Sequence, residues 1–319
     1  MRQLPRLAVL LLAACAAPQQ PAGNDSSWAS GRWDVTVDDP GGGYPSWFEI
    51  DEQSGQWSGR LVGQFGSVRP IAQIAVEGNQ LSFRLPPQYE QHKSDLVFEG
   101  SWDGEAIRGT TNSADGTQIP FSARPAPSLQ PSGEPQWGEP VDLLADGLQA
   151  WQLRRPDGPD GWKLEGGLLA NTPPSLDLIS RQEFADFKLR LEFNMPEGSN
   201  SGVYLRGRYE VQVQDDHGKE PESKHCGGVY GFIAPSKMAA RPAGEWNSYE
   251  ITLIGRRIRL VFNGQTVIDH QEIPGITGGA LDSRESEPGP LMLQGDHEAI
   301  QYRNIVLTPA LPQNPGSQE

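Results

Sequence analysis

Residues 200–215 read NSGVYLRGRYEVQVQD, and this stretch decides the fold. In its second half, the apolar side chains of Tyr209, Val211 and Val213 alternate with glutamate and glutamine. Successive side chains of a β-strand point to opposite faces, so a period of two makes one face apolar and leaves the other in water. Half-buried strands of this kind are typical of antiparallel sheets. The stretch therefore predicts antiparallel β-structure, with Glu210 on a solvated face.

The same alternation recurs on both sides of this stretch. It covers residues 187–194 (FKLRLEFN) and residues 249–253 (YEITL). Farther along, Asn263 and Gly264 form an Asn-Gly pair between two apolar runs, which is the strongest short signal for a β-hairpin. No segment after Trp137 keeps a helical period. We therefore expect the C-terminal half to be an antiparallel β-sandwich of the jelly-roll kind.

The region before Trp137 is organised differently. From Gly31 to Arg124, short β-like runs recur about every ten residues with turn residues between them, which predicts a small antiparallel barrel or sandwich. The proline-rich residues 125–136 cannot readily join either sheet and predict a linker. The expected divisions are a signal peptide (1–14), a lipidated cysteine with a flexible tether (15–27), a small all-β domain of unknown role (28–124), the linker (125–136), the β-sandwich (137–309) and a disordered tail (310–319).

The N-terminus predicts export. Two arginines precede a short apolar run at residues 7–12, and residues 12–15 read LAAC. This order is typical of a secretory signal, and the apolar run is too short to span a membrane. The LAAC stretch resembles the bacterial lipobox, which implies that Cys15 becomes the acylated N-terminus. We expect a protein that is lipid-anchored to the cell envelope, at the periplasmic or surface face of the outer membrane in a Gram-negative cell.

Charge and missing motifs exclude several classes of function. The formal net charge is −15, which argues against nucleic acid and anionic lipid headgroups as partners, so that the only membrane contact expected is the lipid anchor. The sequence has no phosphate-binding glycine loop, no HExxH zinc motif and no GxSxG nucleophile elbow. After processing, Cys226 is the only other cysteine, so no internal disulfide can form. We expect Cys226 to be a small buried residue rather than a nucleophile.

The solvated strand faces and strand ends carry side chains that suit a sugar. Ordinary solvated faces hold mainly Lys, Glu, Ser and Thr, whereas these hold Tyr, Arg, Gln, Trp and Asn, which supply directed hydrogen bonds and aromatic platforms. The alternatives are a plain solvated face, or a metal site that joins Asp215 with His217, His225 or His297. The candidate site residues are Glu192, Tyr204, Arg206, Glu210, Gln212, Asp215, Tyr230, Trp246, Asn247, Gln294 and His297.

Several motifs in fixed order carry a family resemblance. Besides residues 200–215, they are LADGLQAW (144–151), GVYG (228–231), AGEWNSYEI (243–251), GITGGAL (275–281), GPLMLQGDH (289–297) and YRNI (302–305). Together they resemble the 3-keto-disaccharide hydrolase domain family, over about Gly138 to Pro309. The resemblance implies a concanavalin-like sandwich that cleaves glycosides whose sugar has first been oxidised to a ketone at C3. It does not cover the first β domain.

The implied chemistry makes sense from first principles. A ketone at C3 acidifies the hydrogen on C2, and the glycosidic oxygen on C1 is β to the resulting carbanion. A site that uses this needs a base, a donor for the enolate oxygen and an acid for the leaving oxygen. We assign His297 or Glu210 as the base and Arg206, or a metal ion, as the group that steadies the enolate. Tyr230, or the other member of the Glu210–His297 pair, would then be the acid.

The remaining candidates would hold the substrate through its hydroxyl groups and ring faces. No motif requires a cofactor, and a divalent metal remains open. A sugar 3-oxidoreductase acting upstream is the partner that the resemblance implies, since it would make the ketone. The alternative function is a non-catalytic, lectin-like carbohydrate-binding lipoprotein on the same sandwich. The expected substrate-binding residues are Glu192, Tyr204, Gln212, Asp215, Trp246, Asn247 and Gln294.

Overall fold

The computed structural model describes residues 26–130 and 133–311. The predicted signal peptide, Cys15 and nearly all of the predicted tether therefore lie outside the described residues, as does most of the predicted tail. Within the described ranges, the only helical segments are two short 3-10 turns, η1 (Ser27–Ala29) and η2 (Gly147–Ala150), and neither they nor anything else there forms a helix long and apolar enough to cross a membrane. The all-β prediction is confirmed.

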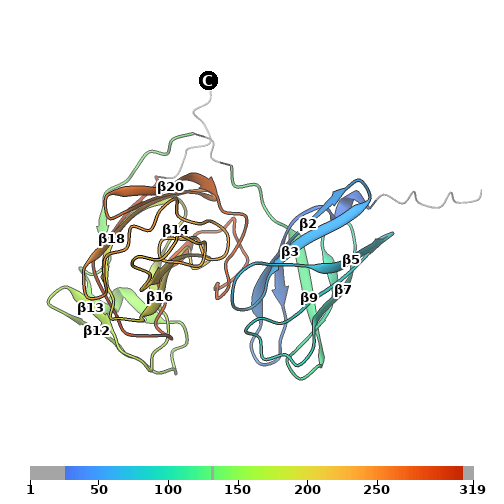
Figure 1. The fold of residues 1–319 in the computed structure, drawn as a ribbon, viewed down its shortest axis with the longest axis horizontal. Coiled ribbons are helices and arrows are strands. Elements are labelled where there is room, and N and C mark those ends of the chain that lie inside the picture. The colour runs from blue at the N-terminus through green and yellow to red at the C-terminus, as the bar shows by residue number, and fades with distance from the viewer. Residues whose placement is uncertain (1–25, 131–132, 312–319) are drawn as a thin grey trace, which may run out of the picture.

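The first domain is one antiparallel sheet that curls into a nearly closed barrel (Figure 1). Its strand order among the described residues is β4-β3-β2-β1-β9-β8-β7-β6-β5. The two ends of the sheet approach each other where the Ile71 N–H donates to the Gly59 carbonyl at 2.9 Å. The strands are β1 (Gly31–Val37), β2 (Tyr44–Gln53), β3 (Gln56–Val62), β4 (Arg69–Pro70), β5 (Ala72–Glu77), β6 (Gln80–Leu85), β7 (Leu96–Trp102), β8 (Ile107–Asn112) and β9 (Gln118–Pro125).

The second domain is a sandwich of two antiparallel sheets. The larger sheet has the order β12-β13-β22-β15-β18-β19-β20, with β10 also paired to β22, and the smaller has the order β11-β14-β21-β16-β17. The strands are β10 (Val141–Asp142), β11 (Trp151–Leu153), β12 (Trp162–Glu165), β13 (Leu168–Asn171), β14 (Leu178–Phe184), β15 (Phe187–Asn194), β16 (Asn200–Leu205), β17 (Tyr209–Gln214), β18 (Asn247–Ile254), β19 (Arg257–Phe262), β20 (Gln265–Glu272), β21 (Gly289–Leu293) and β22 (Ile300–Pro309).

The predicted alternation places the core between these sheets. All four apolar residues of β15 are buried, and they share one cluster with Tyr209, Val211 and Val213 of β17. The Asn-Gly hairpin is confirmed, because Asn263 and Gly264 both have positive φ (48° and 75°) between the paired ends of β19 and β20. Both central residues of a type I′ turn need positive φ, and Asn-Gly is a favoured pair for this turn. The observed angles therefore fit the type I′ turn.

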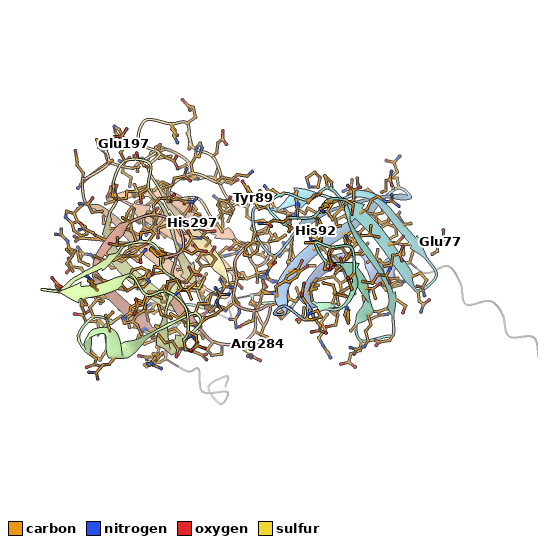
Figure 2. The ribbon with its side chains drawn as sticks, turned by 90° about the horizontal axis from the view of Figure 1, so that it is seen from below. Glu77, Tyr89, His92, Glu197, Arg284 and His297 are labelled. Atoms are coloured by element: carbon orange, nitrogen blue, oxygen red, sulfur yellow. The ribbon has the colours of Figure 1, made fainter. Side chains whose placement is uncertain are left out.

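The two domains pack against each other through specific side chains. Trp47 of β2 is fully buried and belongs to the hydrophobic cluster of the sandwich, where its ring meets Phe232 edge-on at 5.5 Å. Arg32 of β1 forms a salt bridge with Glu272 at the end of β20. Figure 2, seen from a direction perpendicular to Figure 1, places Tyr89 at the junction between the domains. The barrel therefore contributes side chains to the surface of the sandwich at this junction.

Candidate active site

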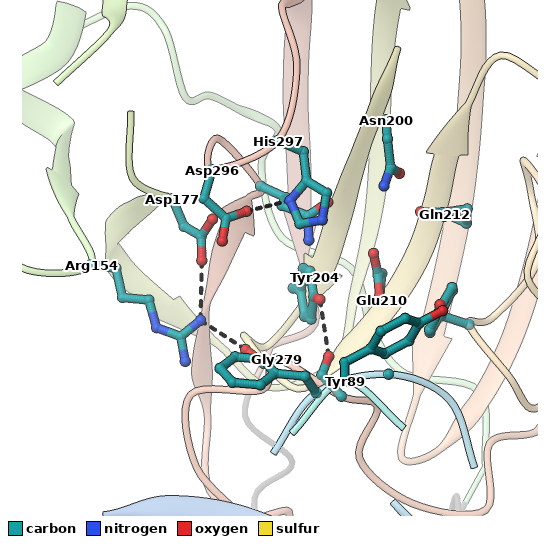
Figure 3. Close-up of a pocket in the computed structure, with 15 residues that line it drawn as sticks. Tyr89, Arg154, Asp177, Asn200, Tyr204, Glu210, Gln212, Gly279, Asp296 and His297 are labelled. Carbon is teal, nitrogen blue, oxygen red and sulfur yellow. Dashed lines mark hydrogen bonds and ion pairs between the residues drawn. The ribbon is translucent and has the colours of Figure 1, made fainter. Parts of the chain in front are cut away.

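A cavity of about 450 Å³ opens at this junction (Figure 3). Twelve of its lining residues come from the sandwich and three from the barrel. Its floor is the face of the smaller sheet that points away from the larger sheet. The lining residues are Phe65, Gly66, Tyr89, Arg154, Asp177, Asn200, Tyr204, Glu210, Gln212, Tyr230, Gly278, Gly279, Gln294, Asp296 and His297.

The β16–β17 hairpin supplies the floor. Because Val203 and Val211 point into the core, Tyr204 and Glu210, which are cross-strand partners, point into the cavity. A side chain at position 202 would collide with the Glu210 carboxyl, so Gly202 leaves the room that this carboxyl occupies. The alternation inferred from the sequence thus puts the glutamate on the floor of the cavity.

Glu210 is a buried carboxyl group with an unusual pKa. It is 4% exposed and forms no salt bridge with another described residue. Burial raises its pKa to about 8, although the Tyr204 hydroxyl and the charge of His297 partly oppose this shift. A carboxyl group with this pKa is mostly protonated at neutral pH, so Glu210 can donate a proton.

His297 and Asp296 form a pair beside this carboxyl. His297 Nδ1 lies 2.6 Å from Asp296 Oδ1, in the loop between β21 and β22 (Figure 3). The hydrogen bond that His297 Nδ1 donates to Asp296 raises the pKa of His297 and lowers that of Asp296. Because Nδ1 is engaged by the carboxylate, Nε2 is the ring nitrogen left to accept a proton. An imidazole oriented in this way by a carboxylate is suited to act as a base.

Arg154 and Asp177 complete the polar wall, and sequence reasoning missed both. Arg154 Nη1 contacts Asp177 Oδ2 at 3.1 Å and donates to the Gly279 carbonyl at 2.9 Å, while Nη2 donates to the Ala280 carbonyl at 3.1 Å. Burial raises the pKa of Asp177. Arg154 follows β11 and Asp177 precedes β14, in connections without alternation, so no local pattern marked them.

Three amide side chains that line the cavity hold unsatisfied acceptors. The side-chain carbonyl oxygens of Asn200, Gln212 and Gln294 are buried and have no hydrogen-bond partner within the described part of the chain. An unpartnered buried polar atom is costly, and it calls for an explanation. Rotation of each amide would present hydrogen-bonding groups to hydroxyls of a ligand in the cavity.

The structure does not bring Arg206 into the cavity. Arg206 lies in the turn between β16 and β17, with φ of 52°, and the turn closes with the Arg208 N–H donating to the Leu205 carbonyl at 3.0 Å. Its buried guanidinium donates to the carbonyls of Gly255 and Glu285. Strand alternation does not continue through a turn, which is why the facing inferred for this residue does not hold.

Two further candidates lie on the larger sheet, away from the cavity. Arg303 of β22 bonds to Glu192 Oε2 at 2.6 Å, and its guanidinium lies 3.8 Å from the centroid of the Trp246 ring. These contacts form a surface cluster on the outer face of β15 and β22, next to the start of β18. The sequence indicated that Glu192 faces outward, but a sandwich has two outward faces. Glu192 lies on the outward face of the larger sheet, whereas the cavity lies on that of the smaller sheet.

Asn247 and Asp215 also have structural partners. The buried Asn247 side-chain oxygen accepts the Arg241 N–H at 2.9 Å, and Asp215 Oδ2 accepts the Gly198 N–H at 2.9 Å. Neither residue lines the cavity. Of the sequence-predicted residues, the cavity therefore contains Tyr204, Glu210, Gln212, Tyr230, Gln294 and His297.

The other sulfur and imidazole groups lie outside the cavity. Burial raises the pKa of the Cys226 thiol to about 12, as expected of a small buried residue rather than a nucleophile. His217 and His225 contact the carbonyls of Ala240 and Glu220, at 2.8 and 2.7 Å. Within residues 26–130 and 133–311, no three His, Cys, Asp or Glu side chains gather as metal ligands would.

The family model for the 3-keto-alpha-glucoside-1,2-lyase-like domain matches residues 140–308, just over half of the chain. The chain belongs to this family. The family resemblance inferred from the motifs is thereby confirmed, and it relates the chain to glycoside-acting enzymes. No curated protein matches.

Two solved structures from Parabacteroides distasonis are among those similar to this member of the family. Both proteins are provisionally named glycosyl hydrolases. The first is 25% identical with a TM-score of 0.45, over 58% of this chain and 92% of that chain. The second is 24% identical with a TM-score of 0.41, over 53% of this chain and 98% of that chain.

Proposed function

We propose that this chain cleaves 3-keto-glycosides by removing the proton on C2 and eliminating the oxygen on C1, with net hydrolysis when water adds to the product. The observation that carries the proposal is that a buried carboxyl with a raised pKa, Glu210, shares one cavity with the His297–Asp296 pair in a member of this family. An elimination needs one group that accepts a proton and another that gives one.

The proposal gives each of these two groups one role. His297 Nε2 takes the C2 proton, and the electrons of the broken C–H bond form the enolate at C2, C3 and O3. The enolate then re-forms the C3 carbonyl, a C1–C2 double bond forms, and the C1–O bond breaks. Glu210 gives its proton to the leaving oxygen. Water added across the new double bond returns a free 3-keto-sugar, and Asp296 is a positioning residue.

Arg154 is the group placed to steady the enolate oxygen in this proposal. Three of its five N–H bonds are engaged by Asp177 and by the carbonyls of Gly279 and Ala280, and two have no partner among the described residues. A guanidinium held in place by such contacts costs little reorganisation when charge develops. This role replaces the one assigned from sequence to Arg206, whose guanidinium is engaged elsewhere.

The proposal predicts a bell-shaped dependence of kcat/KM on pH. Activity falls on the acid side as His297 becomes protonated, at a pKa raised above 6.5, and it falls on the alkaline side as Glu210 ionises near pH 8. Initial rates on methyl 3-keto-α-glucoside between pH 5 and pH 10 test this. A rate that keeps rising above pH 9 would contradict the acid role.

The decisive experiment follows substrate and product by mass spectrometry. The purified chain is incubated with 3-keto-trehalose, with the same compound deuterated at C2, and with unoxidised trehalose, each with and without EDTA. Cleavage of the keto form alone, slowed severalfold by deuterium, supports elimination. Intact substrate together with calorimetric binding would instead identify a carbohydrate-binding module. The EDTA samples report any requirement for a metal.

Two proposals concern the surroundings of the enzyme. Cys15, outside the described residues, would anchor the protein to the cell envelope through a lipid, and a sugar 3-oxidoreductase would supply the ketone. The second follows from the chemistry, because an ordinary glycoside has no carbonyl to acidify its C2 hydrogen. Mass spectrometry of the membrane fraction tests the anchor, with an acylated peptide that begins at Cys15 as the expected product.

A further inference from the structure

We infer that the N-terminal barrel supplies the subsite for the leaving group, through the aromatic side chains of Phe65 and Tyr89. The sandwich would hold the oxidised sugar at Glu210 and His297, and the barrel would select the sugar or other ring that departs. This inference rests on the proposed function of the same cavity and concerns a domain outside the family match.

Exposure singles out these two side chains. Among the described residues, the large hydrophobic side chains that remain exposed are Phe65 (46%), Tyr89 (61%), Leu148 (37%) and Leu311 (46%). Both aromatic ones line the cavity, and neither aliphatic one does. Apolar surface left in water at a cavity marks a binding site, and aromatic faces suit the C–H faces of sugar rings.

The backbone beneath these rings is held firmly. The Gly279 N–H donates to the Gln64 carbonyl at 2.9 Å, and a side chain at Gly278 would collide with the Gly66 backbone, so the two domains meet here main chain to main chain. Such close backbone packing fixes the loop that carries Phe65. The aromatic ring is exposed, yet its attachment point is rigid.

The residues on either side of Tyr89 are anchored as well. The Gln88 side chain accepts the Ser67 N–H at 3.1 Å, and the carboxylate of Glu90, 4% exposed, forms a salt bridge with Arg69. Both contacts tie the loop of Tyr89 to the loop of Phe65. An exposed ring on a tethered backbone loses little entropy when a ligand binds, which favours recognition.

The arrangement of the cavity indicates which part of the substrate lies there. In Figure 3, Glu210 lies between His297 and Tyr89. With C2 of the substrate at His297 and the leaving oxygen at Glu210, the leaving group extends toward Tyr89. The Tyr89 hydroxyl also interacts with that of Tyr230, which joins the barrel to the sandwich at this point.

The test compares a large leaving group with a small one. Phe65→Ala, Tyr89→Ala and the double variant are assayed on 3-keto-trehalose and on methyl 3-keto-α-glucoside. For the double variant we expect kcat/KM on 3-keto-trehalose to fall about tenfold through KM, because two ring contacts are lost, and to change less than twofold on the methyl compound. Leu148→Ala, exposed but outside the cavity, is the matched control, and Tyr89→Phe retains the ring and most of the activity.

The outcomes separate this inference from the proposed function. If the double variant loses equal activity on both compounds, or on neither, the leaving-group subsite is wrong while the elimination stands. If the unchanged chain cleaves no 3-keto-glycoside, the proposed function is wrong and the subsite fails with it. Melting temperatures within about 1 °C of the unchanged chain are expected, because exposed side chains contribute little to stability.

Discussion

Glu210 and Asp34 are both carboxyl groups whose pKa is raised to about 8, mainly by burial. Each also borders a hollow, of about 450 Å³ for Glu210 and about 380 Å³ for Asp34. Their neighbours differ. Glu210 shares its cavity with the His297–Asp296 pair and with exposed aromatic rings, whereas Asp34 lies among charges that are already paired.

The charges around Asp34 lie where the two domains meet. Asp34 belongs to β1 of the barrel, and the fully buried Glu285 belongs to the sandwich, where it forms a salt bridge with Arg256. Arg208 pairs with Asp282 at 2.8 Å in the same region. A shifted pKa therefore has two different meanings in this protein. Beside an oriented imidazole it indicates acid–base chemistry, and between paired arginines it reflects the burial of a domain interface.

The largest expected effect is the loss of activity on neutralising Glu210. Glu210→Gln should lower kcat on methyl 3-keto-α-glucoside by roughly 10²–10⁴-fold, because a positioned acid contributes about that much. Asp34→Asn, its matched control at the interface, should leave kcat within about twofold. Initial rates measured by mass spectrometry decide the matter. Equal losses of kcat in the two variants would mean that the two carboxyl groups do not differ in function.

The second effect depends on the leaving group. A 4-nitrophenolate ion leaves without a proton, so Glu210→Gln should lose less than about tenfold on 4-nitrophenyl 3-keto-α-glucoside. His297→Gln removes the base and should lose roughly 10²-fold or more on this compound and on the methyl compound alike. Release of nitrophenolate is followed by absorbance. The roles are reversed, with Glu210 the base and His297 the acid, if Glu210→Gln loses activity equally on both compounds while His297→Gln loses less on the nitrophenyl compound.

The third effect concerns Arg206, which lies in the region of Asp34 rather than that of Glu210. Arg206→Met leaves buried carbonyl groups without a donor, at a cost of about 1–3 kcal/mol. We expect the melting temperature to fall by roughly 5 °C while kcat/KM of the folded protein stays within about threefold. Calorimetry and rate assays on the same sample test both. A hundredfold loss of turnover at unchanged stability would restore the enolate role first assigned to it.

Arg206 also shows how much of the site could be predicted from the sequence. Alternation is a local property of a strand, so it predicted that Tyr204, Glu210 and Gln212 face away from the core. It could not follow Arg206 into a turn with positive φ, nor choose between the two outward faces of the sandwich for Glu192.

The residues that the sequence did not predict share one physical reason. Arg154 and Asp177 lie in connections, and their places depend on contacts with residues more than 100 positions away, such as Gly279 and Gly295. Phe65 and Tyr89 reach the cavity only because one domain docks on the other. Periodicity within a segment carries no information about such long-range contacts.

The smallest effect is the dependence of stability on pH at Asp34. Its pKa is raised from 3.8 to about 8, so between these values the folded chain holds a proton that the unfolded chain releases, and the free energy of unfolding falls as pH rises through this window. The side chain of Asp34→Asn does not titrate, so the variant lacks this dependence of stability on pH. It should therefore melt higher than the unchanged chain at pH 8.5, by a few degrees, and by less at pH 5. Scanning calorimetry at the two pH values tests this. Equal gains at both would mean that Arg256 and Arg208 keep Asp34 ionised throughout, and the two carboxyl groups would then differ in pKa as well as in surroundings.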